Sequence, residues 1–428
     1  MTLRNQITLP FAAAFFVLIP LMATASAATA SSDWPAWRGP AATGWVGADA
    51  LPTEWSAQDG LCWSTDLPGP SAATPIVVGD RIFISVGLEK SVELWALART
   101  SGEKLWSRDV APSNQETRKQ DMSSPSSVVE GDLVVTMTGT GVLRGFTVQG
   151  EELWTRNLVS EYGDFGLMWG YASSPLLEDG TAYVQVLHGM RTDDPSYVLA
   201  IDAKTGETKW RIERPTDAKA ESPDAYTTPV RLDRAGGWEL VISGGDYVTG
   251  HDPATGKEIW RLGGLNPERH GMYRIVATPI VIGNKLIVPS RVSPLLVFDV
   301  PMDGPPQLAW ELDRGTDVPA PTSDGTSLFV VNDRGILRRF DLTTGEETSE
   351  PMRLPQGSYS GSPILAGDML YVTNEEGTTA VVKTSGEPTL VAENVTAGKM
   401  LASLAASDGR LFLRTADRLY CIGDAFPE

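Results

Sequence analysis

A short hairpin signature recurs along this chain and constrains the fold more than any other feature. In residues 197–210 (YVLAIDAKTGETKW), strand-forming residues lead into a polar turn, and a second short strand ends in Trp. Gly206 suits the left-handed position that closes such a turn, because it carries no Cβ to clash. Related copies end at Trp106, Trp154 and Trp260, a weaker one ends at Trp310, and Ser349 and Leu390 stand where two later copies would carry Trp.

A second signal, a small residue followed by Pro and an apolar strand, lies between the hairpins. It occurs at Thr74, Ser124, Ser174, Thr228, Thr278, Ala320 and Ser362, and a last copy at Ser403 lacks the Pro. Successive spacings are 50, 50, 54, 50, 42, 42 and 41 residues. A period of roughly 40 to 50 residues with several short strands is typical of propeller blades. The sequence therefore predicts an all-β fold, an eight-bladed β-propeller of four-stranded antiparallel blades. The Trp residues, which recur at one strand position, are predicted to pack between blades.

The two ends of the repeat region each look like half of a hairpin. Residues 61–67 resemble a second half and residues 418–423 a first half, so their pairing would close the ring and leave no unpaired edge. Alignment on the complete hairpin at 197–210 places Cys421 directly opposite Cys62, at a separation that suits a disulfide. A turn one residue shorter would shift the register. A disulfide between Cys62 and Cys421 and two unlinked cysteines in the core are equal alternatives at this point.

The N-terminal region precedes the repeats and has two parts. Residues 1–27 combine Arg4, an apolar run and Ala25-Ser26-Ala27, the pattern of a cleaved signal peptide. Residues 28–59 are rich in Trp, Pro and Gly and are expected to form a strap packed on the propeller, with an aromatic ligand-binding lip as the alternative. The propeller itself is assigned to residues 60–428. We expect an exported protein, periplasmic or secreted, that is monomeric and not inserted in a membrane.

The chain is acidic, with a formal net charge of −19 from 35 basic and 54 acidic residues. Nucleic acids and anionic membranes require a basic surface, so neither is an expected partner. The three histidines, His188, His251 and His270, show no metal-ligand spacing, and no metal site is predicted.

Three segments carry a family resemblance: WPAWRGPAATG at 34–44 and the runs 239–260 and 413–423. With the hairpins and Pro-marked strands, they resemble the PQQ-like repeat of quinoprotein-type eight-bladed propellers, in particular an exported bacterial subgroup. The same repeat builds alcohol and glucose dehydrogenases and also the non-catalytic propeller lipoprotein of the outer-membrane β-barrel assembly machinery. The resemblance therefore implies the fold and leaves the function open.

The site chemistry separates these functions. Alcohol-oxidising members of the family stack PQQ between a Trp and a disulfide of two adjacent Cys, with calcium and an Asp base beside it. This chain has no adjacent Cys pair, and no calcium-ligand set or catalytic Asp maps onto it. We therefore expect no catalytic residues and no cofactor, and a binding or scaffolding module for a protein or polymer partner. The alternative is a PQQ- and calcium-dependent oxidoreductase of alcohols or sugars; carbohydrate recognition by an aromatic-lined face is a further possibility within the binding class.

Binding residues are sought on the loops near the inner strands, because loops on a rigid scaffold carry most binding residues. The best cluster for a ligand mouth comprises Trp169, Tyr171, His270, Tyr273 and Arg274. Further candidates are Asp246, Tyr247, Asp333, Arg334 and Glu375. The alternative for each of these residues is a place in a turn or a hydrogen bond between neighbouring blades.

Overall fold

A computed structural model describes residues 1–2, 33–47 and 50–426. The chain divides into two units, Met1–Ser32 and Asp33–Glu428, and the second contains all the strands. The predicted signal peptide, except for its first two residues, lies outside the described residues, and so does its boundary with the strap. In the described part of the chain, no helix is both long and apolar enough to cross a bilayer.

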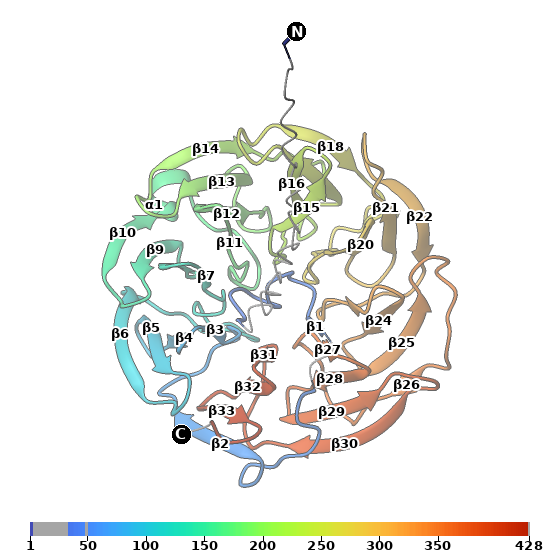
Figure 1. The fold of residues 1–428 in the computed structure, drawn as a ribbon. Coiled ribbons are helices and arrows are strands. Elements are labelled where there is room, and N and C mark those ends of the chain that lie inside the picture. The colour runs from blue at the N-terminus through green and yellow to red at the C-terminus, as the bar shows by residue number, and fades with distance from the viewer. Residues whose placement is uncertain (3–32, 48–49, 427–428) are drawn as a thin grey trace. The chain divides into compact units, whose positions relative to one another are not determined.

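Eight antiparallel sheets of four strands form a ring, as predicted (Figure 1). Each blade runs from an inner strand at the centre to an outer strand at the rim. The first two blades consist of β3 (Ile76–Val78), β4 (Arg81–Gly87), β5 (Val92–Ala98) and β6 (Lys104–Ala111), then β7 (Val128–Glu130), β8 (Leu133–Met137), β9 (Val142–Thr147) and β10 (Glu152–Asn157). The next two consist of β11 (Leu176–Glu178), β12 (Thr181–Val186), β13 (Tyr197–Asp202) and β14 (Thr208–Glu213), then β15 (Val230–Arg234), β16 (Gly237–Gly244), β17 (Tyr247–His251) and β18 (Glu258–Leu262). A five-residue helix, α1 (Leu158–Tyr162), follows β10 and is capped by the Asn157 side chain.

The remaining blades are built in the same way. Blade five consists of β19 (Ile280–Ile282), β20 (Lys285–Pro289), β21 (Leu295–Asp299) and β22 (Gln307–Leu312), and blade six of β23 (Thr322–Ser323), β24 (Ser327–Val331), β25 (Ile336–Asp341) and β26 (Met352–Arg353). Blade seven consists of β27 (Ile364–Ala366), β28 (Met369–Thr373), β29 (Thr378–Lys383) and β30 (Thr389–Val395), and strand β1 (Trp45–Gly47) of the strap adds to it in parallel with β27.

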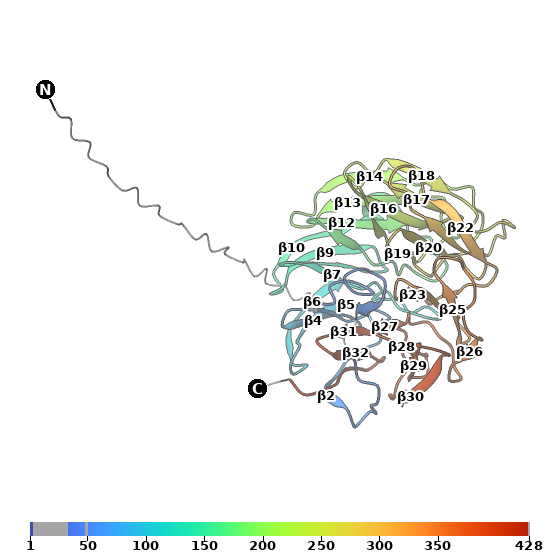
Figure 2. The same ribbon diagram turned by 45° about the vertical axis from the view of Figure 1, so that its right-hand side comes forward.

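The ring closes through the two ends of the repeat region, as predicted. Blade eight takes β31 (Ala405–Ser407), β32 (Arg410–Arg414) and β33 (Arg418–Ile422) from the C-terminal part and β2 (Leu61–Asp66) from the N-terminal part. Strand β2 pairs antiparallel with β33, and it lies beside the C-terminal strands in both ribbon views (Figure 2). The outer strand of this blade therefore comes from the opposite end of the chain.

The predicted register of the two cysteines at this seam is wrong. Cys421 lies opposite Trp63, and Cys62 is the extra residue of a β-bulge. The cause is visible in the hairpin used for alignment, where Ala200 pairs with Trp210 and the bulge falls at Lys209. Both cysteines are free thiols in the structure, and the Cys62 Sγ donates to the Asp424 carbonyl at 3.1 Å. The direct opposition on which the disulfide was predicted is therefore absent, and the bond itself stays a prediction.

Most of the recurring Trp residues pack against a turn of the next blade, as predicted. Trp260 differs, because its indole donates to Glu239 of its own blade at 2.6 Å. Trp154 in blade two donates its indole N–H to the Ala203 carbonyl in blade three at 2.8 Å. The turn glycine of blade three, Gly206, approaches the same ring so closely that a Cβ there would lie 2.7 Å from it. The same pairing joins Trp63 to Gly102, Trp106 to Gly150, Trp210 to Gly256, and Trp310 to Gly345. At these five steps, each Trp and the turn glycine of the next blade form a contact between neighbouring blades.

The described part of the strap packs against the inner strands. Its Trp34 is only 2% exposed and pairs through its backbone with Val77 of β3. The Pro35 carbonyl accepts the Val129 N–H of blade two. The Arg38 guanidinium reaches the Ala320 and Pro321 carbonyls of blade six, which lies opposite blade two in a ring of eight. The strap therefore crosses the centre of the ring (Figure 1).

Candidate ligand pocket

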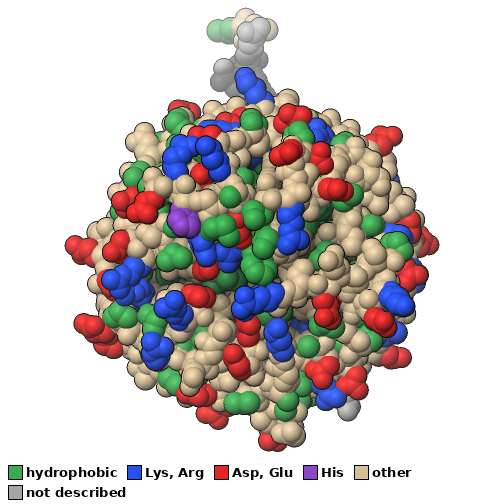
Figure 3. All heavy atoms as spheres, turned by 180° about the vertical axis from the view of Figure 1, so that it is seen from behind, with side chains coloured by type: hydrophobic (Ala, Val, Ile, Leu, Met, Phe, Trp, Pro, Cys, Tyr) green, Lys and Arg blue, Asp and Glu red, His purple; other side chains and the backbone are tan. Residues whose placement is uncertain are grey.

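A pocket of about 400 Å3 lies at the centre of the ring, next to the strap residue Trp37. Its walls come mainly from the loops that join the outer strand of one blade to the inner strand of the next, such as the loops carrying Lys119, Trp169 and Arg274. Figure 3 looks onto this face, which is hollowed near its centre, with hydrophobic side chains in the hollow and basic side chains around it. The volume lies in the range of small-molecule sites.

A belt of hydroxyl groups surrounds the pocket where the inner strands begin. In each of six blade-to-blade steps, a backbone N–H two residues before an inner strand donates to the Ser or Thr hydroxyl at the same position in the next blade. The donor–acceptor pairs are Thr74–Ser126 (2.9 Å), Ser126–Ser174 (3.0 Å), Ser174–Thr228 (3.3 Å), Thr228–Thr278 (2.9 Å), Ala320–Ser362 (2.9 Å) and Ser362–Ser403 (2.9 Å). Apart from Thr74 and Ala320, every residue of this belt lines the pocket.

The belt corrects the sequence interpretation of blade two. The Ser-Pro pair at Ser124 marks that blade by sequence, but the residue equivalent to Thr74 is Ser126, two residues later. The error arises because Pro125 mimics the motif although the equivalent position, Ser127, is not Pro. The hydroxyls also have a function that the pattern did not reveal, since they satisfy backbone N–H groups that would otherwise be buried without a partner.

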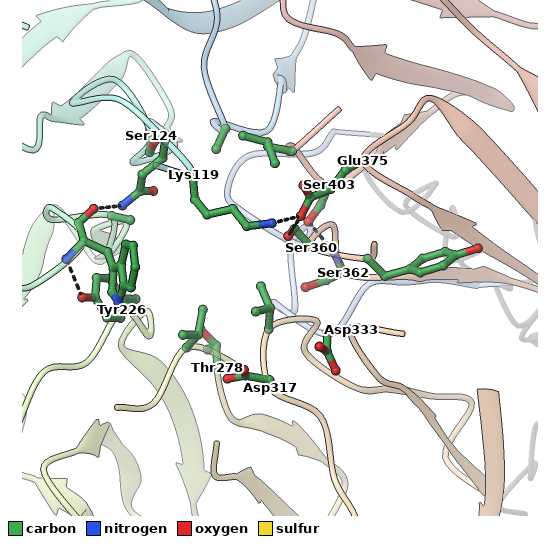
Figure 4. Close-up of a pocket in the computed structure, with 18 of the residues that line it drawn as sticks. Lys119, Ser124, Tyr226, Thr278, Asp317, Asp333, Ser360, Ser362, Glu375 and Ser403 are labelled. Carbon is green, nitrogen blue, oxygen red and sulfur yellow. Dashed lines mark hydrogen bonds and ion pairs between the residues drawn. The ribbon is translucent and has the colours of Figure 1, made fainter. Parts of the chain in front are cut away.

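One ion pair spans the mouth of the pocket. The Lys119 Nζ lies 2.6 Å from the Glu375 Oε1, although the two residues come from the loop between blades one and two and from the β28–β29 turn (Figure 4). The same carboxylate accepts from the Ser360 hydroxyl at 2.6 Å. Burial alone would raise the pKa of Glu375, but the Lys119 ammonium and the Ser360 hydroxyl outweigh it and lower the pKa. Glu375 is therefore a firmly ionised anchor for a half-exposed lysine.

A second charged group lies in the wall formed by blades three to six. Arg274 lies between two carboxylates, 3.6 Å from Glu221 and 3.5 Å from Asp317. The Trp169 indole donates to the same Glu221 at 2.8 Å and is thereby held at the pocket edge. Burial raises the pKa of Asp317, and the nearby Arg274 and Arg291 oppose that rise only in part. Its Oδ1 atom is buried and has no hydrogen-bond partner.

The strap contributes one aromatic side chain, Trp37, to the pocket lining. Its neighbour Arg38 is fully buried, lies 5.6 Å from the Trp37 ring and donates to backbone carbonyls of blade six. Burial without a carboxylate lowers the pKa of Arg38 to about 9. Arg38 thus fixes the strap beneath the pocket, with Trp37 at the pocket floor.

The structure brings four of the predicted site residues together around this pocket: Trp169, Arg274, Asp333 and Glu375. Three others lie elsewhere on the loops. His270 and Tyr273 contact each other, with ring centroids 6.3 Å apart, but do not line the pocket, and neither does the exposed Arg334.

The remaining predicted residues have other surroundings. Tyr171 is buried in the core, where its hydroxyl donates to the Gln185 carbonyl, so its assignment to the mouth is wrong. Asp246 and Tyr247 line a separate cavity of about 210 Å3 in blade four. There, the buried Asp246 carboxylate accepts from Asn266 at 3.1 Å, which gives it a structural contact.

Sequence reasoning missed several residues of the pocket, namely Trp37, Arg118, Lys119, Asp317 and the hydroxyl belt. It also missed Glu221, which contacts the lining residues Trp169 and Arg274. The hydroxyl belt could have been found from the sequence, because most of its Ser and Thr residues belong to the repeated motif that predicts the blades. Lys119 carries no such signal, because its partner Glu375 is 256 residues away. Trp37 belongs to the strap, which the aromatic-lip alternative places near a ligand.

The pocket does not match a site for PQQ with calcium. Among the described residues, no group of three His, Cys, Asp or Glu side chains is arranged to hold a metal ion. Two of the three basic side chains in the lining, Lys119 and Arg274, already contact carboxylates. A quinone that carries carboxylates would compete with these internal partners, so the donor set is a poor fit for it.

Comparison with known proteins identifies relatives of two kinds. A family model described as "outer membrane protein assembly factor BamB" matches residues 46–164 and 149–350. Among curated proteins, subunit 1 of the cytochrome c methanol dehydrogenases of Methylobacterium organophilum and Methylorubrum extorquens is 32% identical over 84 residues. That stretch is 19% of this chain and only 13% of either dehydrogenase subunit.

Solved structures give the same two kinds of relative. BamB from Moraxella catarrhalis superposes with a TM-score of 0.63 at 16% identity, over 84% of this chain and 98% of that one. A europium-containing methanol dehydrogenase superposes with a TM-score of 0.70 at 12% identity, over 92% of this chain and 98% of that one. The quinohemoprotein alcohol dehydrogenase of Comamonas testosteroni superposes with a TM-score of 0.65 at 15% identity, over 93% of this chain and 82% of that one. At these identities the likeness establishes the fold alone.

Proposed function

Because this chain belongs to the β-propeller family described as outer membrane protein assembly factor BamB, we propose that it is a binding module and not a catalyst. The proposal places a segment of a protein or polymer partner in the central pocket. It also includes export, a monomeric state and the absence of a cofactor.

One observation carries the proposal: two of the three basic side chains in the pocket lining are paired with carboxylates. The lining has three basic residues, Arg118, Lys119 and Arg274, and three acidic ones, Asp317, Asp333 and Glu375. Lys119 pairs with Glu375, and Arg274 lies between Glu221 and Asp317. A general base or nucleophile needs a reactive group that is poised next to an activating partner. A lining of hydroxyl groups, with two of its basic side chains already paired, is instead suited to holding a polar partner by many hydrogen bonds.

Site-specific photo-crosslinking tests where a partner binds. A photoreactive amino acid at Arg118, which is exposed at the pocket, should give a crosslinked adduct in the native host. The matched control is Leu105, which is 46% exposed on the outer strand β6, away from the pocket. We expect an adduct from position 118 and none from position 105. Equal labelling at both positions, or none at either, would contradict a partner at the pocket.

The alternative is a quinone-dependent oxidoreductase, and the local match to methanol dehydrogenase favours it. Purified protein with added PQQ and calcium separates the two functions. We expect no alcohol- or sugar-dependent reduction of an electron-accepting dye. Saturable turnover under these conditions would replace the binding module with an enzyme.

A further inference from the structure

The hydroxyl groups of the belt are available to hydrogen-bond a ligand in the pocket. Each of the six hydroxyl oxygens accepts a backbone N–H from the preceding blade, as described above. Among the described residues, no acceptor is found for the hydroxyl protons of these six residues. A hydroxyl has one proton and two lone pairs, so each of these six hydroxyls keeps a proton and one lone pair for a further partner. A ligand rich in hydroxyl groups can therefore both accept from the belt and donate to it.

The acidic side chains of the pocket supply the complementary acceptors. Asp317 and Asp333 both line the pocket, and Asp333 lies exposed on the β24–β25 turn (Figure 4). A ligand that fills the pocket must therefore also donate hydrogen bonds. Equal numbers of acidic and basic residues in the lining and the net charge of −19 both disfavour an anionic ligand.

Aromatic side chains also line the pocket, beside the hydroxyl and acidic groups. Trp37 lines the floor, and Trp169 and Tyr226 line one wall. Their positions are fixed, since Arg38 anchors the strap and the Tyr226 hydroxyl accepts the Trp169 backbone N–H at 3.1 Å. A flat indole face favours a ligand that has an apolar face of its own.

We infer that the pocket binds a neutral saccharide unit. A sugar ring has hydroxyl groups that both accept and donate, carries no charge, and presents a face of C–H groups that packs on an indole. It would accept from the belt, donate to Asp317 and Asp333, and lie over Trp37. This inference rests on the proposed binding function and specifies its polymer as a glycan.

The test is calorimetric titration of the full mature chain with short neutral oligosaccharides of glucose, mannose, galactose or N-acetylglucosamine. Parallel titrations use the corresponding polysaccharides, to separate recognition of a free sugar from that of a polymer. We expect saturable binding of at least one saccharide. Trp37→Leu, which removes the aromatic face, should weaken it by about tenfold. Asp333→Asn, which replaces one acceptor oxygen by a donor, should weaken it several-fold.

The matched control is Trp238→Leu in β16, where Trp238 packs edge-to-face on Tyr183 with centroids 5.4 Å apart, outside the pocket. It should bind as the wild type does. Thermal melting verifies that Trp37→Leu is folded, and Asp333→Asn tests the same site without altering the strap. Failure of every neutral saccharide, unchanged binding in both folded pocket variants, or a preference for acidic sugars would overturn the inference. Crosslinking at position 118 without saccharide binding would refute the saccharide and leave the binding function standing.

Discussion

Trp154 and Gly206 form the contact that joins one blade to the next. The indole N–H of Trp154 donates to Ala203 in the turn that Gly206 closes, and a Cβ on Gly206 would lie 2.7 Å from the ring. The equivalent glycine of blade seven, Gly386, has no atom within 4 Å of such a Cβ, because Ser349 replaces the Trp of blade six. The motif is therefore a pair of residues in neighbouring blades, and where the Trp is lost the glycine loses its contact.

This pairing predicts different costs for two chemically identical substitutions. Gly206→Ala and Gly386→Ala both place Ala at a positive φ, +75° and +71°, which costs about 1 kcal/mol. Only Gly206→Ala also drives a methyl group into an indole, which adds about 2 kcal/mol. Chemical denaturation of both variants measures the difference. An equal loss of stability in both variants would mean that the Trp154 indole moves aside without a cost in free energy.

Arg339 is predicted to replace the missing Trp between blades six and seven. Its Nη1 atom donates to the Thr384 and Gly386 carbonyls of blade seven, each at 2.6 Å. Thr384 occupies the position at which the indoles donate in other blades. Arg339→Ala should lower the free energy of unfolding by about 2 kcal/mol, the contribution of charged hydrogen bonds. Arg338→Ala, which removes only a pair with Glu347 on the surface, should cost less than about 1 kcal/mol. Similar losses in both variants would contradict the assigned role.

Asp224 should make stability depend on pH in a characteristic way. The carboxylate accepts the N–H groups of Met168, Gly189 and Met190, but burial outweighs these bonds and raises its pKa from 3.8 to about 6. A pKa raised by folding stabilises the protein below the unfolded value, and this stability is lost as the pH rises through about 6. Asp224→Asn should be less stable at pH 4, because its amide cannot accept all three bonds.

At pH 4 the free energy of unfolding of Asp224→Asn should lie below that of the wild type. This difference should shrink by up to about 3 kcal/mol between pH 4 and pH 7, since only the wild type must ionise a buried carboxyl. Denaturation of both proteins across this range measures it. Other titrating groups cancel in the difference between the two proteins. A deficit that stays constant with pH would show that Asp224 keeps an ordinary pKa.

The two cysteines at the seam are expected to be unlinked. Burial and the neighbouring Cys62 thiol raise the pKa of Cys421, so its thiol is unreactive in the folded protein. After unfolding without a reducing agent, both cysteines should be alkylated. Peptide mapping that recovers a crosslinked Cys62–Cys421 peptide would instead show that the bulge permits the bond, which would tie the ends of the ring together by about 4–5 kcal/mol.

The sequence by itself determined the repeat, the number of blades and the closure of the ring. These features follow from local rules, because alternating strands and Gly-containing turns act over a few residues and recur with each blade. The same local reasoning failed where a bulge adds one residue. It placed Cys62 opposite Cys421, whereas Trp63 occupies that position. It also misjudged blade two, where Pro125 imitates a motif whose structural position is Ser127.

Only the tertiary structure decided the pocket. Lys119 and Glu375 are 256 residues apart, and Arg38 and Pro321 are 283 residues apart, so no local pattern links them. Trp169 and Arg274 were found from the sequence because they are conspicuous on loops, but Tyr171, chosen by the same reasoning, faces the core. A ring brings one residue from each blade to its centre, and which side chains point there depends on how the blades close around it. Periodicity along a chain specifies the blades, whereas the site exists only after they have closed into a ring.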